Sequence, residues 1–510
     1  MGKTIRDLWE NSEKEYAQLP AVRWIVKGEV KERSYRELGE NIRNIRKGLS
    51  AQGFEGKHIA LLGVSSVEWV EAYFGTVTGK NTAVPIDAAL SPADIIDLLN
   101  RSDTEGLFID PKFLALVEPI KENCPKVKKL WVLDNSDTQG TETVDSLCAS
   151  GKGAADSAAP DEDDVAMIIY TSGTTGKSKG VMLLHKNLFN NVEALGIAPM
   201  PGVVFMSVLP VHHAFCLVMD WLQGFNIGAT ISINDSLLHL VKNMSVFKPF
   251  VILMVPLMLE TIYKRLRSAA GKMIPEEVRQ KVFGGNLERI YSGGAHLEPF
   301  YIEEFAKYGV QVLEGYGMSE CSPVISTNTV ECYKPGSIGK PLPNVEIKFE
   351  DGEILVRSTS VMQGYYKMEQ ETGETLKDGW LHTGDKGYMD EDGFLFINGR
   401  VKNLIILSNG ENISPEEIES KIALDPLVNE VIITGDGNAL TAHIYPEQEF
   451  AAGKGEDELK NDLQKVLDTY NKEQPTYRQL SKLVVRKNPF LKTTTRKILR
   501  AEVLRDEPIA

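Results

Sequence analysis

The chain has 510 residues, of which 42% are hydrophobic and 25% are charged, and its net charge is −15. This length is expected to give two or three domains, each with its own core. The acidic balance argues against a protein that coats nucleic acid, and no apolar run approaches the ~18 residues of a membrane span. We therefore expect a globular multidomain protein with no nucleic-acid partner and no integral membrane segment.

The five cysteines are scattered, and no two of them have the spacing of metal ligands. This pattern is typical of reduced thiols in a cytosolic protein, and the N-terminus lacks the apolar core of a secretion signal. A cytoplasmic location is therefore predicted. The sequence leaves the oligomeric state open, a homodimer included.

Residues 1 to about 150 alternate helical and strand patterns, as doubly wound α/β folds do. Residues 57–64 and 82–86 are predicted strands, and residues 68–79 between them are a predicted amphipathic helix. Residues 151–164 are small, polar and acidic, which predicts an exposed linker.

The stretch DVAMIIYTSGTTGKSKGV, residues 164–181, is the richest in chemistry. Residues 165–170 are apolar enough for a buried strand, and the next ten residues hold three glycines, three threonines, two serines and two lysines. Glycines let backbone N–H groups converge on an anion, and the hydroxyls and the two lysines add donors and positive charge. Such a loop suits a polyphosphate, the ordinary alternative being a surface loop of small residues.

This loop differs from a Walker A loop. Gly176-Lys177-Ser178 is present, but Thr171 stands where that motif needs its first glycine. The residues that follow, GVMLL, indicate a strand, whereas a Walker loop opens into a helix. We therefore predict a strand–loop–strand connection.

Later in the chain the α/β pattern resumes, with predicted strands at residues 203–209, 229–233 and 251–255. Residues 335–397 consist of short strands and Gly-rich turns, which predicts a small β-rich subdomain. A boundary is predicted at residues 399–402. It divides an N-terminal domain, 1–401, from a C-terminal domain, 403–510.

The C-terminal domain is predicted to contain strands at 403–407, 428–434, 439–445 and 483–486, helices from Pro415 and over 456–471, and a last helix. Ser414 is placed as the N-cap of its first helix, Pro415 takes the first helical position, and Glu417 is expected to complete a capping box.

Five further segments carry polar groups that could act on a ligand: YSGGA at 291–295, EGYGMSE at 314–320, DGWLHTGD at 378–385, GRVK at 399–402 and KTTTRK at 492–497. Each also has an ordinary interpretation when it is taken alone. A strand can end in two glycines, a turn can expose a glutamate, and a basic run can be a solvated face or touch nucleic acid.

Together with the glycine-rich loop, these segments resemble the signatures of the adenylate-forming superfamily. Its members are acyl- and aryl-CoA synthetases, peptide-synthetase adenylation domains and luciferases, and the resemblance runs from about Ser34 to Lys497. It implies an α/β fold. A large N-terminal domain would combine doubly wound α/β subdomains with a small β-rich subdomain, and a small mobile α+β domain would follow.

The resemblance also implies an ATP site. Tyr316 would stack on adenine, Ser319 would bond a phosphate oxygen, and Asp385 would accept both ribose hydroxyls. Glu320 would bind Mg²⁺, which prefers oxygen ligands. The full set implied to bind ATP is Thr171, Ser172, Gly173, Thr174, Thr175, Gly176, Lys177, Gly293, Gly294, Ala295, Glu314, Tyr316, Gly317, Ser319, Asp385 and Arg400.

Lys497 matches the superfamily's catalytic lysine, which a mobile domain brings to the reacting phosphate. Lys402 matches the hinge, and Gly410 is implied to lie near the tunnel for the thiol. The superfamily usually has glycine where this chain has Arg496.

His213 matches the gate beside the acyl pocket and is a second candidate catalytic residue. The surrounding residues 203–222 are strongly apolar, and nothing in the HHAF segment matches the aspartate with which amino-acid-activating relatives hold an α-ammonium group. Both observations favour a plain carboxylic acid with an alkyl chain. Residues 407–415 most resemble fatty acyl-CoA synthetases.

We therefore expect an acid–thiol ligase that uses ATP, Mg²⁺ and CoA. A carboxylic acid would be converted to an acyl-adenylate and pyrophosphate, and then to acyl-CoA and AMP. Three alternatives stay open. A ligase that loads an acyl or aryl acid onto a carrier protein would prefer the holo-carrier to CoA, a P-loop ATPase would release ADP, and a nucleotide-binding scaffold would bind ATP without turnover.

Overall fold

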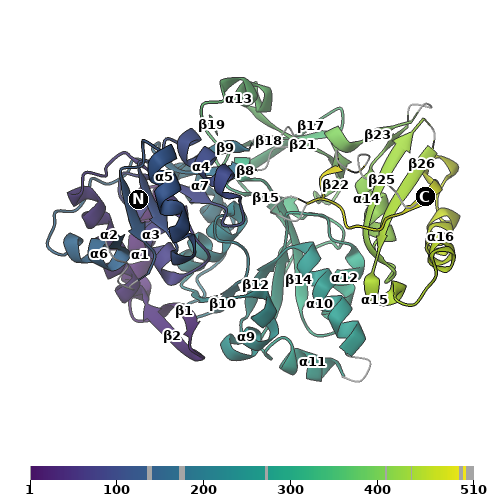
Figure 1. Ribbon diagram of the computed structural model, residues 1–510, viewed down its shortest axis with the longest axis horizontal. Coiled ribbons are helices and arrows are strands. Elements are labelled where there is room, and N and C mark those ends of the chain that lie inside the picture. The colour runs from purple at the N-terminus through teal and green to yellow at the C-terminus, as the bar shows by residue number, and fades with distance from the viewer. Residues whose placement is uncertain are drawn as a thin grey trace. The chain divides into compact units, whose positions relative to one another are not determined.

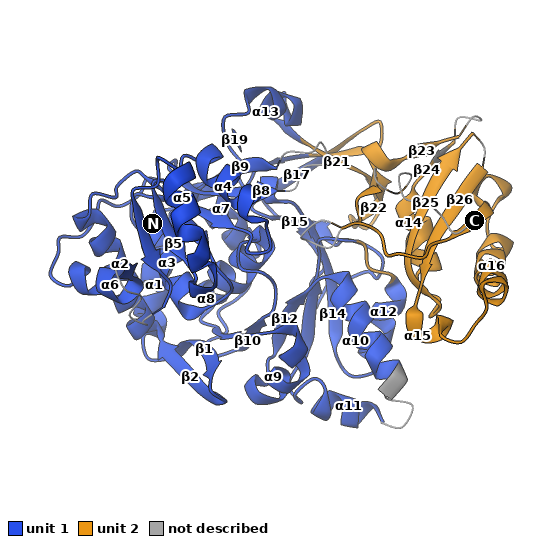
Figure 2. Cartoon of the chain, in the orientation of Figure 1, with its two compact units in different colours: residues 1–295, 299–347, 356–381 blue, residues 296–298, 348–355, 382–510 orange. Residues whose placement is uncertain are grey.

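The computed structural model describes residues 2–134, 141–171, 178–269, 274–407, 411–437, 439–492, 498–500 and 503. The chain divides into two compact units (Figure 2). Unit 1 comprises residues 1–295, 299–347 and 356–381, and unit 2 comprises residues 296–298, 348–355 and 382–510. Each unit is described separately below.

A mostly parallel sheet is built from the first part of unit 1. Within the described residues its eight strands lie in the order β19–β9–β8–β4–β3–β5–β6–β7. Their bounds are β3 (His58–Leu62), β4 (Thr82–Ile86), β5 (Gly106–Ile109), β6 (Lys129–Val132), β7 (Glu142–Thr143), β8 (Val165–Thr171), β9 (Lys179–Leu184) and β19 (Gly364–Tyr365). Only β9 and β19 run antiparallel to their neighbours. Strands buried on both faces, such as β4 with all five residues buried, explain why their sequences are continuously apolar.

The second sheet of unit 1 has nine strands in the described part of the chain, in the order β16–β15–β14–β13–β12–β10–β11–β1–β2. Their bounds are β1 (Pro20–Val26), β2 (Glu29–Ser34), β10 (Val204–Ser207), β11 (Thr230–Ile233), β12 (Val251–Met254), β13 (Arg289–Ser292), β14 (Gln311–Gly317), β15 (Val324–Thr327) and β16 (Lys340–Pro341). The strands from β14 to β1 run parallel, and antiparallel strands close both edges.

Helices accompany both sheets of unit 1 (Figure 1). They are α1 (Ile5–Tyr16), α2 (Tyr35–Ala51), α3 (Val67–Val77), α4 (Pro92–Arg101), α5 (Val117–Asn123), α6 (Val144–Gly151), α7 (His185–Ala194), α8 (Gln223–Asn226), α9 (Leu240–Phe247), α10 (Pro256–Ala269), α11 (Pro275–Lys281), α12 (Pro299–Ala306) and α13 (Glu369–Thr375). None of the described helices is both long enough and apolar enough to cross a membrane.

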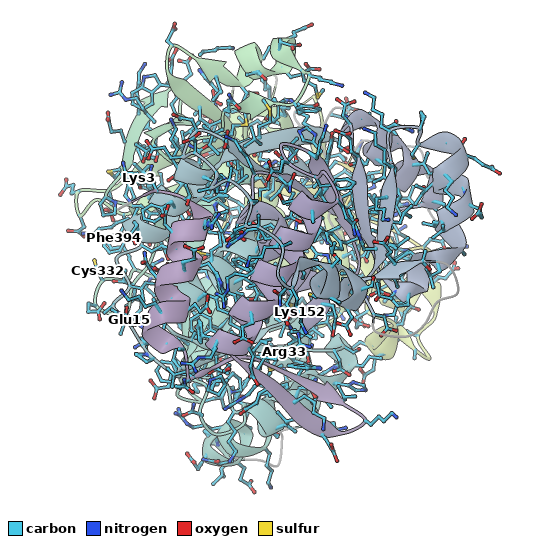
Figure 3. The ribbon with its side chains drawn as sticks, turned by 90° about the vertical axis from the view of Figure 1, so that its left-hand side faces the viewer. Lys3, Glu15, Arg33, Lys152, Cys332 and Phe394 are labelled. Carbon is cyan, nitrogen blue, oxygen red and sulfur yellow. The ribbon has the colours of Figure 1, made fainter. Side chains whose placement is uncertain are left out.

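Aromatic side chains join the N-terminal helices to the centre of unit 1. Trp9 of α1 lies 5.0 Å from Phe225 of α8 and 5.4 Å from Phe74 of α3, measured between ring centroids. Glu71 of α3 forms an ion pair with Arg33 of β2, and Arg33 is labelled in Figure 3. Burial raises the pKa of Glu71 to about 7, and Arg33 acts against that rise.

A β-rich region follows the second sheet, as predicted. Its five strands within the described residues are β17 (Val345–Glu350), β18 (Glu353–Ser358), β20 (Leu376–Lys377), β21 (Trp380–Met389) and β22 (Leu395–Arg400). They form one sheet in the order β17–β18–β21–β20, with β22 paired to β21.

The C-terminal part of unit 2 has its own apolar core. Its described elements are β23 (Ile405–Ile406), β24 (Asn412–Ile413), α14 (Pro415–Ile422), β25 (Val428–Asp436), β26 (Ala439–Pro446), α15 (Gln448–Ala451), α16 (Glu456–Lys472) and β27 (Leu480–Val485). The α/β fold class with a large N-terminal and a smaller α+β C-terminal region is thereby confirmed. The division into domains at Lys402 stays a prediction.

Two local predictions were wrong, and a third is untested. Ser414 is the N-cap of α14 and Pro415 its first residue, but no capping box forms, because the Glu417 carboxylate pairs with Arg478. The strand expected at 403–407 is reduced to β23 and is preceded by the 3₁₀ turn η5 (Val401–Asn403). The predicted last helix lies mostly outside the described residues.

The segment predicted as an exposed linker, residues 151–164, is anchored. Arg46 of α2, with a side chain only 1% exposed, donates to both carboxylate oxygens of Asp156 at 2.7 and 2.6 Å. Ser157 beside it is buried. A buried guanidinium needs a charged partner, and the acidic composition of the segment supplies one.

Candidate active site

The glycine-rich loop connects two antiparallel strands. Strands β8 and β9 pair from Val165 opposite Leu184 to Thr171 opposite Lys179. This confirms the predicted strand–loop–strand arrangement and separates the segment from a Walker loop, which leads into a helix. The predicted phosphate ligands Ser172, Gly173, Thr174, Thr175, Gly176 and Lys177 lie outside the described residues.

An arginine that lies outside the predicted motifs holds the ends of this hairpin together. Arg101, the last residue of α4, donates from Nη2 to the carbonyl oxygen of Ser178 at 2.5 Å and from Nη1 to its Oγ at 3.3 Å. The guanidinium also lies over the ring of Tyr170, 5.4 Å from the centroid. Burial raises the pKa of Tyr170 to about 12, so its phenol stays protonated beside the arginine.

The two predicted strand-end segments lie side by side. Strands β13 and β14 are parallel neighbours, with Ser292 opposite Glu314. A Cβ atom added to Gly293 would lie 3.2 Å from the carbonyl oxygen of Gly315, and Gly294 has a φ of +84°. The conformation and the close packing therefore favour glycine at both positions. Ala295 follows them at the end of this part of unit 1.

Strand β14 carries the residues predicted to contact the nucleotide. Glu314 and Tyr316 are buried, and Glu314 Oε2 accepts a hydrogen bond from the backbone N–H of Gly336 at 3.3 Å. At Gly317 an added Cβ would lie 2.0 Å from the carbonyl oxygen of Pro323, so only glycine fits there. The strand thus places its predicted nucleotide-binding residues at the same end of the sheet as Gly293.

Ser319 and Glu320 form the 3₁₀ turn η4 (Ser319–Cys321) directly after β14. The Glu320 carboxylate accepts a hydrogen bond from the hydroxyl of Tyr365 at 2.9 Å. Both carboxylate oxygens are hard donors of the kind that Mg²⁺ prefers, so the side chain fits the predicted metal ligand. Among the described residues no group of three His, Cys, Asp or Glu side chains is placed to hold a metal.

The predicted acyl region begins at the two histidines. Their rings lie 4.4 Å apart, and His212 Nε2 is 3.6 Å from Asp87 Oδ1. Burial, together with the neighbouring His213, lowers the pKa of His212 to about 4, so His212 is neutral at physiological pH. His213 is the more exposed of the two.

A π-helix follows the histidines. It is η2 (Phe215–Leu222), and seven of its eight residues are buried. The ring of Phe215 would contact a Cβ atom on Gly293 at 3.6 Å, so the apolar helix begins beside the strand-end glycines. Asp220 is fully buried in this helix and burial raises its pKa to about 7. π-helical turns are rare and occur often at functional sites.

In unit 2, two predicted ATP ligands are cross-strand neighbours. Asp385 of β21 is opposite Arg400 of β22, and Arg400 Nε lies 2.9 Å from Asp385 Oδ1. The aspartate is only 4% exposed. Glu353 supports the strand by accepting hydrogen bonds from the N–H of Gly384 at 2.8 Å and from Nδ1 of His382 at 3.2 Å.

The remaining predicted residues belong to the C-terminal region. Lys402 is exposed in η5. Lys497 and Gly410 lie outside the described residues, as does Arg496. Sequence reasoning missed Arg101, Glu353 and Tyr365, because each acts on a residue far away in the chain and none lies in a recognisable motif.

Comparison with known proteins defines the class. Residues 9–366 match the AMP-binding enzyme family, and residues 402–506 match the AMP-binding enzyme C-terminal domain. The chain therefore belongs to the AMP-binding enzyme family.

Among its curated relatives are the long-chain-fatty-acid–CoA ligase of Escherichia coli O157:H7 and the long-chain-fatty-acid–CoA ligase FadD15 of Mycobacterium bovis. The first is 28% identical, with 99% of this chain and 94% of the relative covered. The second is 28% identical, with 78% and 74% covered.

Solved structures share the fold. The anthranilate CoA ligase AuaEII, in complex with anthranoyl-AMP, has a TM-score of 0.86 at 21% identity and covers 98% of this chain and 96% of its own. ATP-bound MatB from Rhodopseudomonas palustris has a TM-score of 0.82 at 25% identity, with 99% and 98% covered.

Proposed function

We propose that this protein is an AMP-forming fatty acyl-CoA synthetase. The observation that carries the proposal is the meeting of Gly293, Gly315 and Phe215. It joins the strand ends of a predicted nucleotide site to a buried apolar helix, where an alkyl acid could place its carboxylate beside the α-phosphate of ATP. The curated relatives described above, which are named as long-chain-fatty-acid–CoA ligases, support the same substrate class.

The reaction would proceed in two steps. In the first, a carboxylate oxygen of the acid forms a bond to the α-phosphorus of ATP, and the bond from that phosphorus to the bridging oxygen breaks to release pyrophosphate. In the second, the CoA thiolate attacks the acyl carbon and AMP leaves. Splitting the acylation into two steps replaces one difficult barrier with two lower ones.

Residues of this chain would bind and orient the substrates. The β14 edge would take adenine against Tyr316 and a phosphate against Ser319, and Asp385 would accept the ribose hydroxyls. Glu320 would hold Mg²⁺, which when bound neutralises charge on the phosphates. The use of Mg²⁺, and of CoA as the thiol acceptor, is part of this proposal.

The mobile domain would serve both steps. Lys497 would stabilise the charge that develops during adenylation, and rotation at Lys402 would withdraw it and open access for the thiol near Gly410. The match to the C-terminal domain begins at Lys402, which supports a hinge there.

A pyrophosphate-release screen tests the function. Linear acids of increasing length, branched acids and aromatic acids are supplied with ATP, with and without CoA, and the products are identified by mass spectrometry. We expect pyrophosphate with linear alkyl acids, and AMP with acyl-CoA only when CoA is present.

Each alternative predicts another product. Release of ADP would identify an ATPase, and acylation of a holo-carrier protein but not of CoA would identify a carrier-loading ligase. ATP binding without turnover of any acid would leave a nucleotide-binding scaffold.

A further inference from the structure

Tyr365 is a buried tyrosine whose backbone is fixed to the strand that follows the glycine-rich loop. It forms β19 with Gly364 and lies opposite Val181 of β9. Its N–H donates to the hydroxyl of Thr372 at 2.9 Å, and its side chain is only 5% exposed. The position of the phenol ring is therefore set by strand pairing and by core packing together.

The segment that ends at Tyr365 forms two hydrogen bonds with Glu320. The backbone N–H of Met362 donates to the carbonyl oxygen of Glu320 at 2.8 Å. The Tyr365 hydroxyl donates to Glu320 Oε1 at 2.9 Å. These contacts fix both the backbone and the carboxylate plane of the one acidic residue in the turn after β14.

The ring of Tyr365 has a second partner. The ammonium group of Lys179, the first residue of β9, lies 4.6 Å from the ring centroid. A cation over the face of an aromatic ring is attracted by the ring's quadrupole. One side chain thus contacts a lysine at the end of the glycine-rich loop and a carboxylate in the turn η4.

We propose that Tyr365 is a positioning residue for the metal and phosphate site: its hydroxyl orients the Glu320 carboxylate, and its ring holds Lys179 beside the loop. The inference rests on the proposed function, because it takes Glu320 as the metal ligand. The hydroxyl engages Oε1, which leaves Oε2 as the oxygen for the cation. Partners that orient metal ligands in this way typically change metal affinity or activity by about 10–100-fold when they are removed.

The test measures ATP affinity by isothermal titration in the absence of acid substrate, so that no ATP is consumed. The dissociation constant is determined with saturating Mg²⁺ and again in EDTA. The ratio of the value in EDTA to the value in Mg²⁺ reports how strongly the protein-bound metal contributes. Tyr365→Phe, which removes only the hydroxyl, should lower this ratio by about tenfold or more and leave the affinity in EDTA unchanged. Tyr365→Leu, which also removes the ring, should weaken binding in EDTA as well, because Lys179 loses its partner.

Two further variants make the result specific. Tyr366→Phe is the matched control, because the adjacent Tyr366 hydroxyl donates instead to Asp103, at 2.6 Å. We expect the wild-type ratio for that variant. Glu320→Gln should lower the ratio on its own, and adding Tyr365→Phe should lower it little further, since the two residues act through one contact.

A wild-type ratio in Tyr365→Phe, with the variant folded by circular dichroism, would overturn the proposal, and so would equal losses in Tyr365→Phe and Tyr366→Phe. An unchanged ratio in Glu320→Gln would also overturn it, since there would be no metal ligand to orient. Pyrophosphate release by the wild-type protein separates these results from failure of the proposed function, because it does not depend on which residue binds the metal.

Discussion

Acid should loosen the N-terminal helix through His185, the first residue of α7. This side chain is 1% exposed, and its Nδ1 accepts a hydrogen bond from the backbone N–H of Ile5 at 3.2 Å. Burial lowers the pKa of His185 from 6.5 to about 4, while Asp164 and Asp7 act in the opposite direction. Protonation of Nδ1 would put two donors face to face, so the folded state favours the neutral ring.

The direction and the size of this change in stability follow from the linkage between protonation and folding. Between pH 6.5 and about 4 the opened state binds a proton that the folded state does not, so stability falls as the pH falls. A shift of this size corresponds to about 3 kcal/mol in full, at about 1.4 kcal/mol per pH unit, and to about 2–3 kcal/mol at a pH near 4.5. Above a pH of about 7 the contribution vanishes.

Hydrogen exchange in α1, read by mass spectrometry as a local opening free energy, measures the effect. His185→Gln keeps an acceptor for Ile5 but cannot titrate. Between a pH of about 7.5 and one of about 4.5, the wild type should lose about 2–3 kcal/mol more than this variant. The same pH dependence in both proteins would refute the reasoning, because every other titrating group is common to them.

Three further substitutions, with one control, test the site. Lys497→Ala should slow adenylation by about 10²–10³ but affect thioester formation from supplied acyl-adenylate much less; equal losses in single-turnover kinetics would contradict domain alternation. Asp385→Asn should raise the KM for ATP by about tenfold or more, since a hydrogen bond to a charged group contributes about 1.5–3 kcal/mol; an unchanged KM in pyrophosphate exchange would remove Asp385 from the site. Gly317→Ala should lower the melting temperature sharply, because its Cβ would meet the Pro323 carbonyl, whereas at Gly373 an added Cβ has nothing within 4 Å. Gly373→Ala in α13 should therefore be neutral or stabilising by up to about 1 kcal/mol.

Local pattern was enough to predict the strands around the loop. An apolar run on each side of a glycine-rich segment predicted β8 and β9, and residues 82–86 matched β4 at both ends. These elements are short and buried, so their own composition specifies them. The resemblance to adenylate-forming enzymes added the family, which the match to the AMP-binding enzyme family confirmed.

Contacts between distant segments could not be predicted in this way. Arg101 and Ser178 are 77 positions apart, and Glu320 and Tyr365 are 45 apart, so no spacing rule connects them. Most residues of the polar segment 151–164 are exposed, as predicted, but its composition could not show that Asp156 pairs with Arg46 of α2. Such pairs depend on which elements the whole fold brings together.

The π-helix η2 has a consequence for how the acyl region can diverge between related proteins. Its last turn is closed by the N–H of Gln223 bonding to the carbonyl of Val218, five residues back. One residue advances an α-helix by about 100°, so losing a single residue from this segment would convert the π-turn into an α-turn and change which side chains within the segment face the predicted acyl region. A one-residue gap here would therefore exchange several of these side chains at once, where point substitutions would change them one at a time.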